Sequence, residues 1–324
     1  MKILTLPLAG SLALAAFSGD AGVAKSSPPL QVEIRNVDLH VTEDVTVQIR
    51  NLRGRFLPVR EGDIPFFDDP NSYVVDVEAG EVAMDEASLN ALVNNHAFGH
   101  GKKPIRNLEL KLEDGMLKQK GVLDKKIDLP FNTKGAVEPT PDGKIRVHAK
   151  SIKSLGLPVK PLMKLFGIEM DDLLKVEPGH GLTVDDNDLI IDPQLMLPPP
   201  RMRGRITSVR VEDGQLIQVF GSVPFRPLQP LASSKNHFYW RGDALRFGRL
   251  TMKNVQLELI DQDASDVFDF SVAGYNRMLV AGYSKTMPDG SLRTYLPDFA
   301  DLANGGPVAH TPAEAAKARR ASRD

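Results

Sequence analysis

The chain has 324 residues, no cysteine, 40 Lys and Arg against 42 Asp and Glu, and an aromatic content of 14 Phe, 5 Tyr and 1 Trp. This composition is typical of a globular protein, and the near balance of charge gives no reason to expect a nucleic-acid partner. The absence of cysteine excludes disulfides, thiolate metal sites, cysteine nucleophiles and a lipidated N-terminal cysteine.

The N-terminus has the order of a secretory signal peptide. Lys2 precedes an apolar run from Ile3 to Phe17, and small residues follow as far as Ala24. A transmembrane span needs about 20 apolar residues, so this run favours cleavage after Ala24 or Ala21 over a retained anchor. We expect residues 1–24 to be removed and the exported protein to be periplasmic or extracellular, with at most peripheral contact with the membrane.

From Leu30 onward, most apolar residues alternate with polar ones. Residues 45–50, 108–113 and 145–149 show the period of two that is typical of a strand with one buried face. Short turn signals separate such runs, and Asp-Gly between alternating segments is a strong hairpin signal. The sequence therefore predicts hairpins around the turns Asp114-Gly115, Asp142-Gly143, Asp185–Asp188, Asp213-Gly214 and Asp289-Gly290.

Three strand-like segments share a short pattern of a basic residue, asparagine and alternating apolar residues. They begin at Arg35, Arg106 and Lys253. Three copies at spacings of 71 and 147 residues do not establish a repeat protein. We interpret them as similar amphipathic strands that use similar residues.

Two segments depart from the strand pattern. Residues 85–98 have apolar residues at helical spacing, Asp85 as a capping residue and glycine at the end; residues 155–176 show the same spacing, with Pro158 and Pro161 in the first turn. A few amphipathic helices among many amphipathic strands predict a β-rich α+β fold. In it, a long curved antiparallel sheet wraps around one or two helices.

The chain divides into four parts in this interpretation. The signal peptide at 1–24 precedes a β-sheet domain at 30–230 and a C-terminal β extension at 236–303, with strands at 244–253 and 255–261. The extension either continues the same sheet or forms a small second unit. Residues 304–324 are rich in alanine and basic residues and are expected to be a disordered basic tail.

The search for catalytic and metal-binding motifs finds no nucleophile elbow, zinc-protease helix, P-loop or dinucleotide fingerprint. His96 and His100 are four residues apart, but Gly99 between them favours helix-end histidines over a metal site. The cluster Asp261, Asp263, Asp266 and Asp269 could attract calcium, yet its spacing is not that of an EF-hand and favours a solvated acidic loop. We expect no enzyme activity, metal or cofactor.

The sequence feature that does indicate a function is the apolar character of the strands. Many strands with an aliphatic face and few aromatics could form a sheet that curls around an apolar groove suited to acyl chains. Pattern alone favours an ordinary filled core, because any sheet needs such a face. The residues predicted to line a groove are apolar and lie on the two helical segments: Leu89, Leu92, Val93, Leu162, Met163 and Phe166.

Several segments together resemble the LmeA-type family of exported bacterial phospholipid-binding proteins. They are residues 84–94, 105–115, 125–131, 156–168 and 199–204, within about residues 32–221. The resemblance implies a TULIP-like β-sheet wrapped around a helix and binding of envelope phospholipid without catalysis. The chain differs in having residues 236–324, where 241–250 is more similar to strands of AsmA-type envelope proteins.

Three hypotheses follow. The first is a non-catalytic cell-envelope protein that binds or transfers phospholipid in an apolar groove. The second is a structural or adhesion module with a filled core. The third is a hydrolase whose residues meet only in the folded chain, for which His96, His100 and a carboxylate in one cleft would be the evidence.

Overall fold

The structure is a computed structural model that describes residues 29–97, 105–124, 128–154, 157–158, 181–185 and 188–303. The predicted signal peptide, most of the second helical segment with Leu162, Met163 and Phe166, and the basic tail lie outside these residues, as does His100. The described part of that segment, Leu157–Pro158, is a short strand and not the predicted first helical turn, because it pairs with residues 153–154 of the preceding strand.

The strands form two sheets. The first sheet has the order β12-β13-β3-β2-β1-β14-β15-β18-β17, with β11 beside β3 and β16 beside β1. Its strands are β1 (Gln31–His40), β2 (Thr46–Pro58), β3 (Tyr73–Asp85), β11 (Arg201–Arg203), β12 (Ile206–Glu212), β13 (Gln215–Phe220), β14 (His237–Phe247), β15 (Leu250–Asp261), β16 (Phe268–Ser271), β17 (Tyr283–Thr286) and β18 (Leu292–Leu296).

The second sheet has the order β4-β5-β6-β7-β10-β9, with β8 beside β7. Its strands are β4 (Ile105–Glu113), β5 (Met116–Asp124), β6 (Asp128–Pro139), β7 (Ile145–Ser154), β8 (Leu157–Pro158), β9 (Leu182–Asp185) and β10 (Asp188–Ile191). The described helices are α1 (Glu86–Ala91), the π-helix η1 (Leu92–Ala97), α3 (Pro193–Met196), α4 (Tyr275–Ala281) and α5 (Phe299–Ala303).

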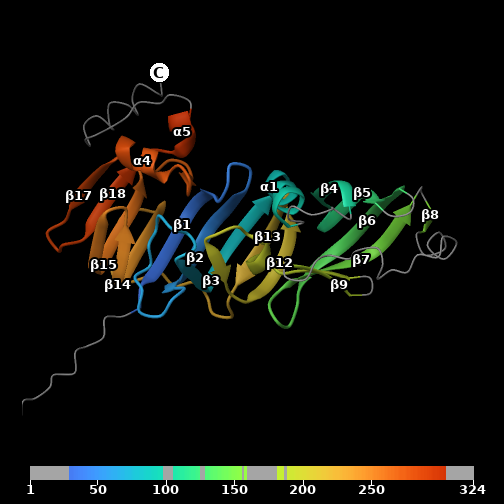
Figure 1. Ribbon diagram of the computed structural model, residues 1–324, viewed down its shortest axis with the longest axis horizontal. Coiled ribbons are helices and arrows are strands. Elements are labelled where there is room, and N and C mark those ends of the chain that lie inside the picture. Colours follow the sequence, from blue (N-terminus) through green and yellow to red (C-terminus); the bar gives the residue numbers. More distant parts are fainter. Residues whose placement is uncertain are drawn as a thin grey trace, which may run out of the picture.

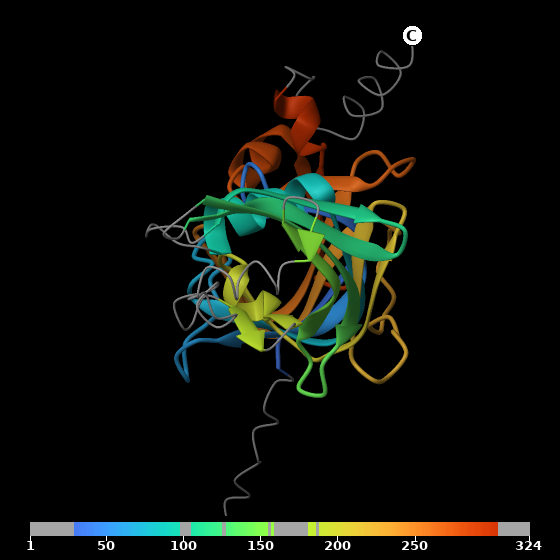
Figure 2. The ribbon, with the colours of Figure 1, turned by 90° about the vertical axis from the view of Figure 1, so that its right-hand side faces the viewer.

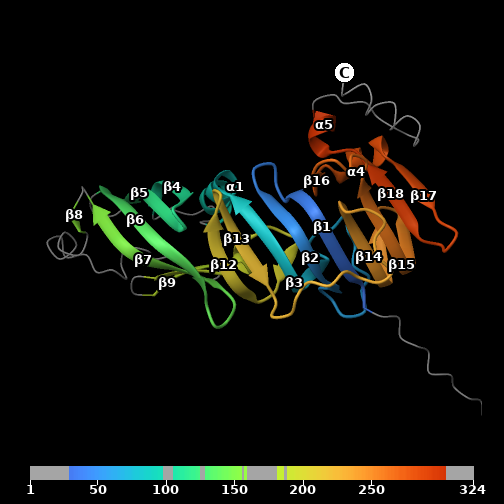
Figure 3. The same ribbon diagram turned by 180° about the vertical axis from the view of Figure 1, so that it is seen from behind.

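The two sheets follow one another along an elongated molecule. The second sheet lies at one end, and α4 and α5 lie at the other (Figures 1 and 3). Seen end on, the strands curl around a central axis (Figure 2). The predicted β-rich fold is confirmed: a strongly curled, mainly antiparallel sheet forms a half-barrel with few helices.

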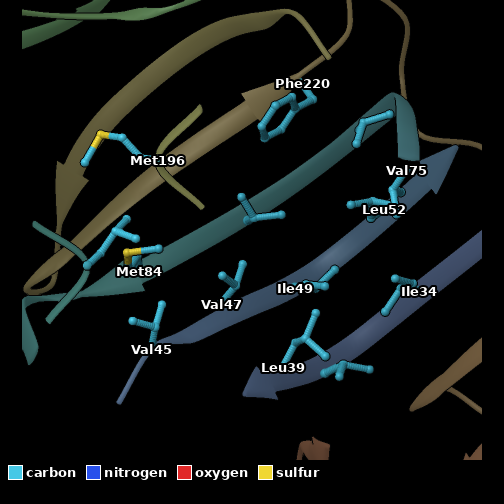
Figure 4. Close-up of a cluster of buried hydrophobic side chains, with 14 of the residues drawn as sticks. Ile34, Leu39, Val45, Val47, Ile49, Leu52, Val75, Met84, Met196 and Phe220 are labelled. Atoms are coloured by element: carbon cyan, nitrogen blue, oxygen red, sulfur yellow. The ribbon is translucent and has the colours of Figure 1, made fainter. Parts of the chain in front are cut away.

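Alternation along the strands separates an apolar inner face from a charged outer face. Apolar side chains of β1, β2, β3 and β13 point to the same side, together with Met196 of α3 (Figure 4). The opposite side carries cross-strand ion pairs, among them Arg53 with Glu78 at 3.0 Å and Arg55 with Asp76 at 2.6 Å. Charge therefore stays outside the curl, where water solvates it.

The predicted hairpins are confirmed. β4 pairs β5, β6 pairs β7, β9 pairs β10, β12 pairs β13 and β17 pairs β18, all antiparallel. Asp114 and Gly115 both have positive φ, at 55° and 70°, and Asp213 and Gly214 repeat this geometry. Asp and Gly adopt such angles with little strain, which explains why the dipeptide located these turns.

One predicted strand is wrong. Residues 244–253 do not form a single strand, because the chain reverses at Gly248, whose φ is +57°. β14 instead extends from His237 to Phe247, and β15 begins at Leu250. The pairing of β14 with β1 also shows that the C-terminal strands continue the first sheet.

The recurring pattern has a backbone explanation. Asn36, Asn107 and Asn254 all lie inside strands with φ between 51° and 52°. Asparagine is one of the few residues with a side chain that tolerates this left-handed conformation. The left-handed backbone conformation shared by these three positions therefore explains the asparagine. Similar amphipathic patterning alone does not explain it.

The predicted helix at 85–98 is observed as α1 followed by η1. Asp85 caps it as predicted, since its carboxylate accepts a hydrogen bond from the Ser88 backbone N–H at 2.8 Å. The polar side of this helix covers the edge of β4. The Asn90 side chain donates to the Leu110 carbonyl at 2.9 Å and accepts from the Leu110 N–H at 2.8 Å, as a neighbouring strand would.

Two further side chains extend this contact along β4. Glu86 accepts from the Leu112 N–H at 2.7 Å, and Asn94 donates to the Leu108 carbonyl at 2.9 Å. In an α-helix, position i+4 overshoots position i by about 40°, whereas the wider turn of a π-helix falls short of it. The change from α1 to η1 therefore helps to keep Glu86, Asn90 and Asn94 on one line facing a straight strand edge. Such cover protects an edge from pairing with other chains.

We expect Asn90→Ala to lower the free energy of unfolding by about 2 kcal/mol, because it leaves the Leu110 N–H and carbonyl without their partner. Urea denaturation measures this loss. Asn95→Ala is the control, since Asn95 makes an exposed contact with Asp44 and should change stability by less than about 0.5 kcal/mol. Equal losses in both variants would show that the edge contact is not stabilising.

Candidate functional site

The three described residues of the predicted groove lie on α1 and η1 and are buried. Leu89, Leu92 and Val93 are 5%, 4% and 6% exposed and belong to the main apolar cluster, with β2, β3 and β4 around them. The helix thus turns its apolar side inward and its polar side to the edge of β4. The structure brings these three residues together; Leu162, Met163 and Phe166 lie outside the described residues.

The inner face changes character along the molecule. Toward α1 and the second sheet it is aliphatic, with residues such as Val47, Ile49 and Leu110. Toward α4 it is aromatic, where Phe67 contacts both Trp240 and Tyr275 edge to face. Rings of the same cluster come from β2, β3, β14, β16 and their loops: Phe56, Tyr73, Phe238, Phe247, Phe268 and Phe270. The aromatic rings therefore gather toward the end with α4, and the aliphatic part lies beside the predicted helix.

The histidines of the catalytic search are paired with carboxylates on the surface. His96 Nε2 lies 3.5 Å from Asp44 Oδ1, and hydrogen bonds from Thr42 and Asn95 lower the pKa of Asp44 to about 2. His148 lies 2.6 Å from Asp188 across the pair β7–β10 and is exposed. Among the described residues no hydroxyl group hydrogen-bonds to either histidine, so we interpret these contacts as surface histidine–carboxylate pairs.

His40 makes the contacts most similar to a catalytic arrangement. Its Nδ1 lies 3.1 Å from Thr46 Oγ1, and its Nε2 pairs with Asp269, which raises the pKa of His40. Thr46 is also the direct cross-strand partner of His40 in the β1–β2 ladder. A cross-strand hydrogen bond of this kind stabilises a sheet without any reaction. The Thr46 N–H donates to Ser88 and so is not available to stabilise an oxyanion.

The predicted acidic loop is partly rearranged by the fold. Asp261 and Asp266 meet Asp298 rather than Asp263 and Asp269, and the three offer carboxylate oxygens within 4.8 Å of one another. A cation that prefers oxygen ligands could be held there. Asp298 precedes α5 in a segment that sequence reasoning did not connect with the loop, and only the pairing of β18 with β15 brings it there.

Burial changes the acidity of these carboxyl groups. It raises the pKa of Asp298 to about 8, with the charge of Asp261 as the second cause, and the pKa of Asp261 to about 6. The pKa of Asp266 is raised as well, by burial and by Asp263. Asp298 also accepts a hydrogen bond from the Asp269 N–H at 2.8 Å, so the cluster joins β16 to the start of α5.

The outer face carries a buried polar cluster that sequence reasoning missed. The segment 221–236 crosses the strands between β13 and β14, as the rear view shows (Figure 3). Glu33 accepts a hydrogen bond from the Leu228 N–H at 2.6 Å, and Glu258 accepts one from the Ser233 N–H at 2.8 Å. His237 lies 3.4 Å from Glu33, and both side chains are 1% exposed. Two buried carboxylates thus fix this crossing segment on the sheet.

Comparison with known proteins adds no assignment. No protein-family model, curated protein or solved structure matches the chain. Within the described residues, no helix combines the length and apolar character needed to cross a bilayer. The candidate site therefore rests on the half-barrel itself: a curled sheet whose aliphatic inner wall ends at an aromatic cluster.

Proposed function

We propose that this protein is a non-catalytic cell-envelope protein that binds or transfers phospholipid through the inner face of its half-barrel. The observation that carries the proposal is the mainly aliphatic wall of a strongly curled sheet, formed by β1, β2, β3, β13 and the helix α1–η1. Acyl chains require such a surface, because most of their binding free energy comes from removing apolar area from water. The resemblance to exported phospholipid-binding proteins supports the same class of ligand.

A second candidate function is a structural or adhesion module with a filled core. The burial of Leu89, Leu92 and Val93 favours it. Side chains that already contact one another leave less surface for a ligand. The two candidates differ in a direct way. A lipid-binding protein takes up acyl chains without unfolding, and a filled core does not.

The test is purification of the full chain without detergent, followed by extraction and mass spectrometry of bound lipid. We expect co-purified phospholipid in a fixed ratio to protein, and transfer of labelled phosphatidylglycerol from donor to acceptor vesicles. Protein that carries no lipid and also takes up none from phosphatidylglycerol vesicles would contradict the proposal and favour the filled-core module.

A further inference from the structure

One polar side chain interrupts the aliphatic wall. Gln218, on β13, alternates with Leu216 and Phe220, which both face inward. Its cross-strand neighbours in the first sheet are Val82 and Val209. Val82 in turn pairs with Ile49, whose side chain points to the inner face (Figure 4). The register therefore places the Gln218 amide on the inner wall and not among the ion pairs outside.

The Gln218 side chain is buried but makes no hydrogen bond to any residue that the structure describes. The residue is 6% exposed. Other glutamines behave differently, since Gln215 donates to Gln48 at 2.5 Å on the outer face and Gln194 donates to the Gly204 carbonyl at 3.1 Å. The Gln218 amide nitrogen and oxygen are not among the fully buried side-chain atoms that lack a partner, so they remain accessible at the inner wall. There the amide offers two donors and an acceptor to a bound molecule. A hydrogen bond from this amide to a bound ligand would explain why position 218 is glutamine, although the other inward-facing residues of β13 are apolar.

The surroundings indicate the chemistry of that partner. The inward residues of β1, β2, β3 and β13 are aliphatic, aromatic or glycine apart from Gln218, so no cation of these strands lies beside it. A phosphate would lose its hydration there without a compensating charge. A neutral carbonyl oxygen needs one N–H donor, which the amide supplies.

We propose that an N–H of the Gln218 amide donates a hydrogen bond to the neutral ester carbonyl of an acyl lipid held in the half-barrel, either a phospholipid or a simple fatty acyl ester. This inference rests on the proposed function and adds the part of the lipid that is recognised. It predicts that binding favours acyl over alkyl chains of the same length, because an ether lacks the carbonyl.

The experiment measures displacement of the hydrocarbon probe diphenylhexatriene by matched competitors. Ester-linked phosphatidylglycerol is compared with its ether-linked analogue, and methyl oleate with oleyl methyl ether. We expect the wild type to bind the ester about tenfold more tightly than the ether, which corresponds to one hydrogen bond. A preference only within the second pair would identify a simple fatty acyl ester, and not a phospholipid, as the source of the carbonyl.

In Gln218→Leu, we expect unchanged binding of diphenylhexatriene and loss of the tenfold preference. The control is Gln256→Leu, which makes the same substitution on β15 opposite Arg241, and it should keep the preference. Circular dichroism checks the fold of both variants. A wild type that binds phosphatidylglycerol with no preference for carbonyl-containing lipids, or a Gln218→Leu variant that retains the preference, overturns this inference and leaves the proposed function standing. A wild type that binds neither probe nor lipid overturns both.

Discussion

Replacing Glu33 by alanine is expected to lower the free energy of unfolding by about 1–3 kcal/mol, the range for leaving a buried N–H without its acceptor. Glu33 is 1% exposed and accepts the hydrogen bond from the Leu228 N–H that holds the crossing segment 221–236 on the sheet. The substitution also leaves His237 without the carboxylate 3.4 Å away. The Leu228 N–H would then be buried without its acceptor, which is costly in an interior of low dielectric.

Urea denaturation measures the loss, and trypsin reports where it arises. Lys235 lies at the end of the crossing segment, next to the buried Asn236. We expect faster cleavage after Lys235 in Glu33→Ala, because the segment has lost one of its two carboxylate contacts. Glu33→Gln retains an oxygen for the Leu228 N–H and should lose less. Glu61→Ala, in the exposed loop between β2 and β3, is the control. If Glu33→Ala were as stable as this control, the carboxylate would not hold the segment.

The features that were predictable from the sequence are those with local causes. An Asp-Gly dipeptide determines its own turn, and alternating residues determine which face of a strand is buried. Asp85 caps the helix only three residues away from its partner. For these reasons the hairpins, the first helix and the curled β-rich fold followed from short stretches of sequence.

The contacts that were missed join residues far apart in the chain. Asn36 and Asn236 are bonded across 200 positions, and Glu33 meets Leu228 across 195. No spacing rule connects such residues, because their proximity depends on the pairing of β1 with β14. The same pairing decides that residues 236–303 continue the first sheet. Gln218 had a signal that could have been used, since it breaks the apolar side of an alternating strand between Leu216 and Phe220.

The predicted groove also followed from the sequence only in part. Helical spacing correctly identified Leu89, Leu92 and Val93 as the apolar side of α1 and η1. Spacing describes which residues turn inward, but it does not say whether a ligand or another side chain occupies the space beside them. Lipid binding therefore remains a proposal that depends on the shape of the whole half-barrel.

A second large effect is expected from the acidic cluster and depends on pH. Asp298 has a pKa of about 8 in the folded protein, raised first by burial and then by Asp261, against 3.8 as its ordinary value. Below about pH 4 the carboxyl group is protonated in both states and the difference contributes nothing. As the pH rises, the unfolded chain releases this proton while the folded chain keeps it. Stability is therefore lost progressively between about pH 4 and pH 8.

Asp298→Asn removes this titration and keeps an oxygen that can accept from the Asp269 N–H. We expect no difference from the wild type near pH 4 and a variant more stable by about 2 kcal/mol at pH 8. The difference between the two pKa values would allow about 6 kcal/mol, which partial solvent exposure and coupling to Asp261 reduce.

Urea denaturation at both pH values, with EDTA present so that no cation replaces the proton, measures the effect. The control is Asp213→Asn, at an exposed turn, and should show no such pH dependence. A variant no more stable than the wild type at pH 8 would mean that the folded chain already accommodates a charged Asp298. The junction of β16 with α5 would then not be held by a protonated carboxyl group.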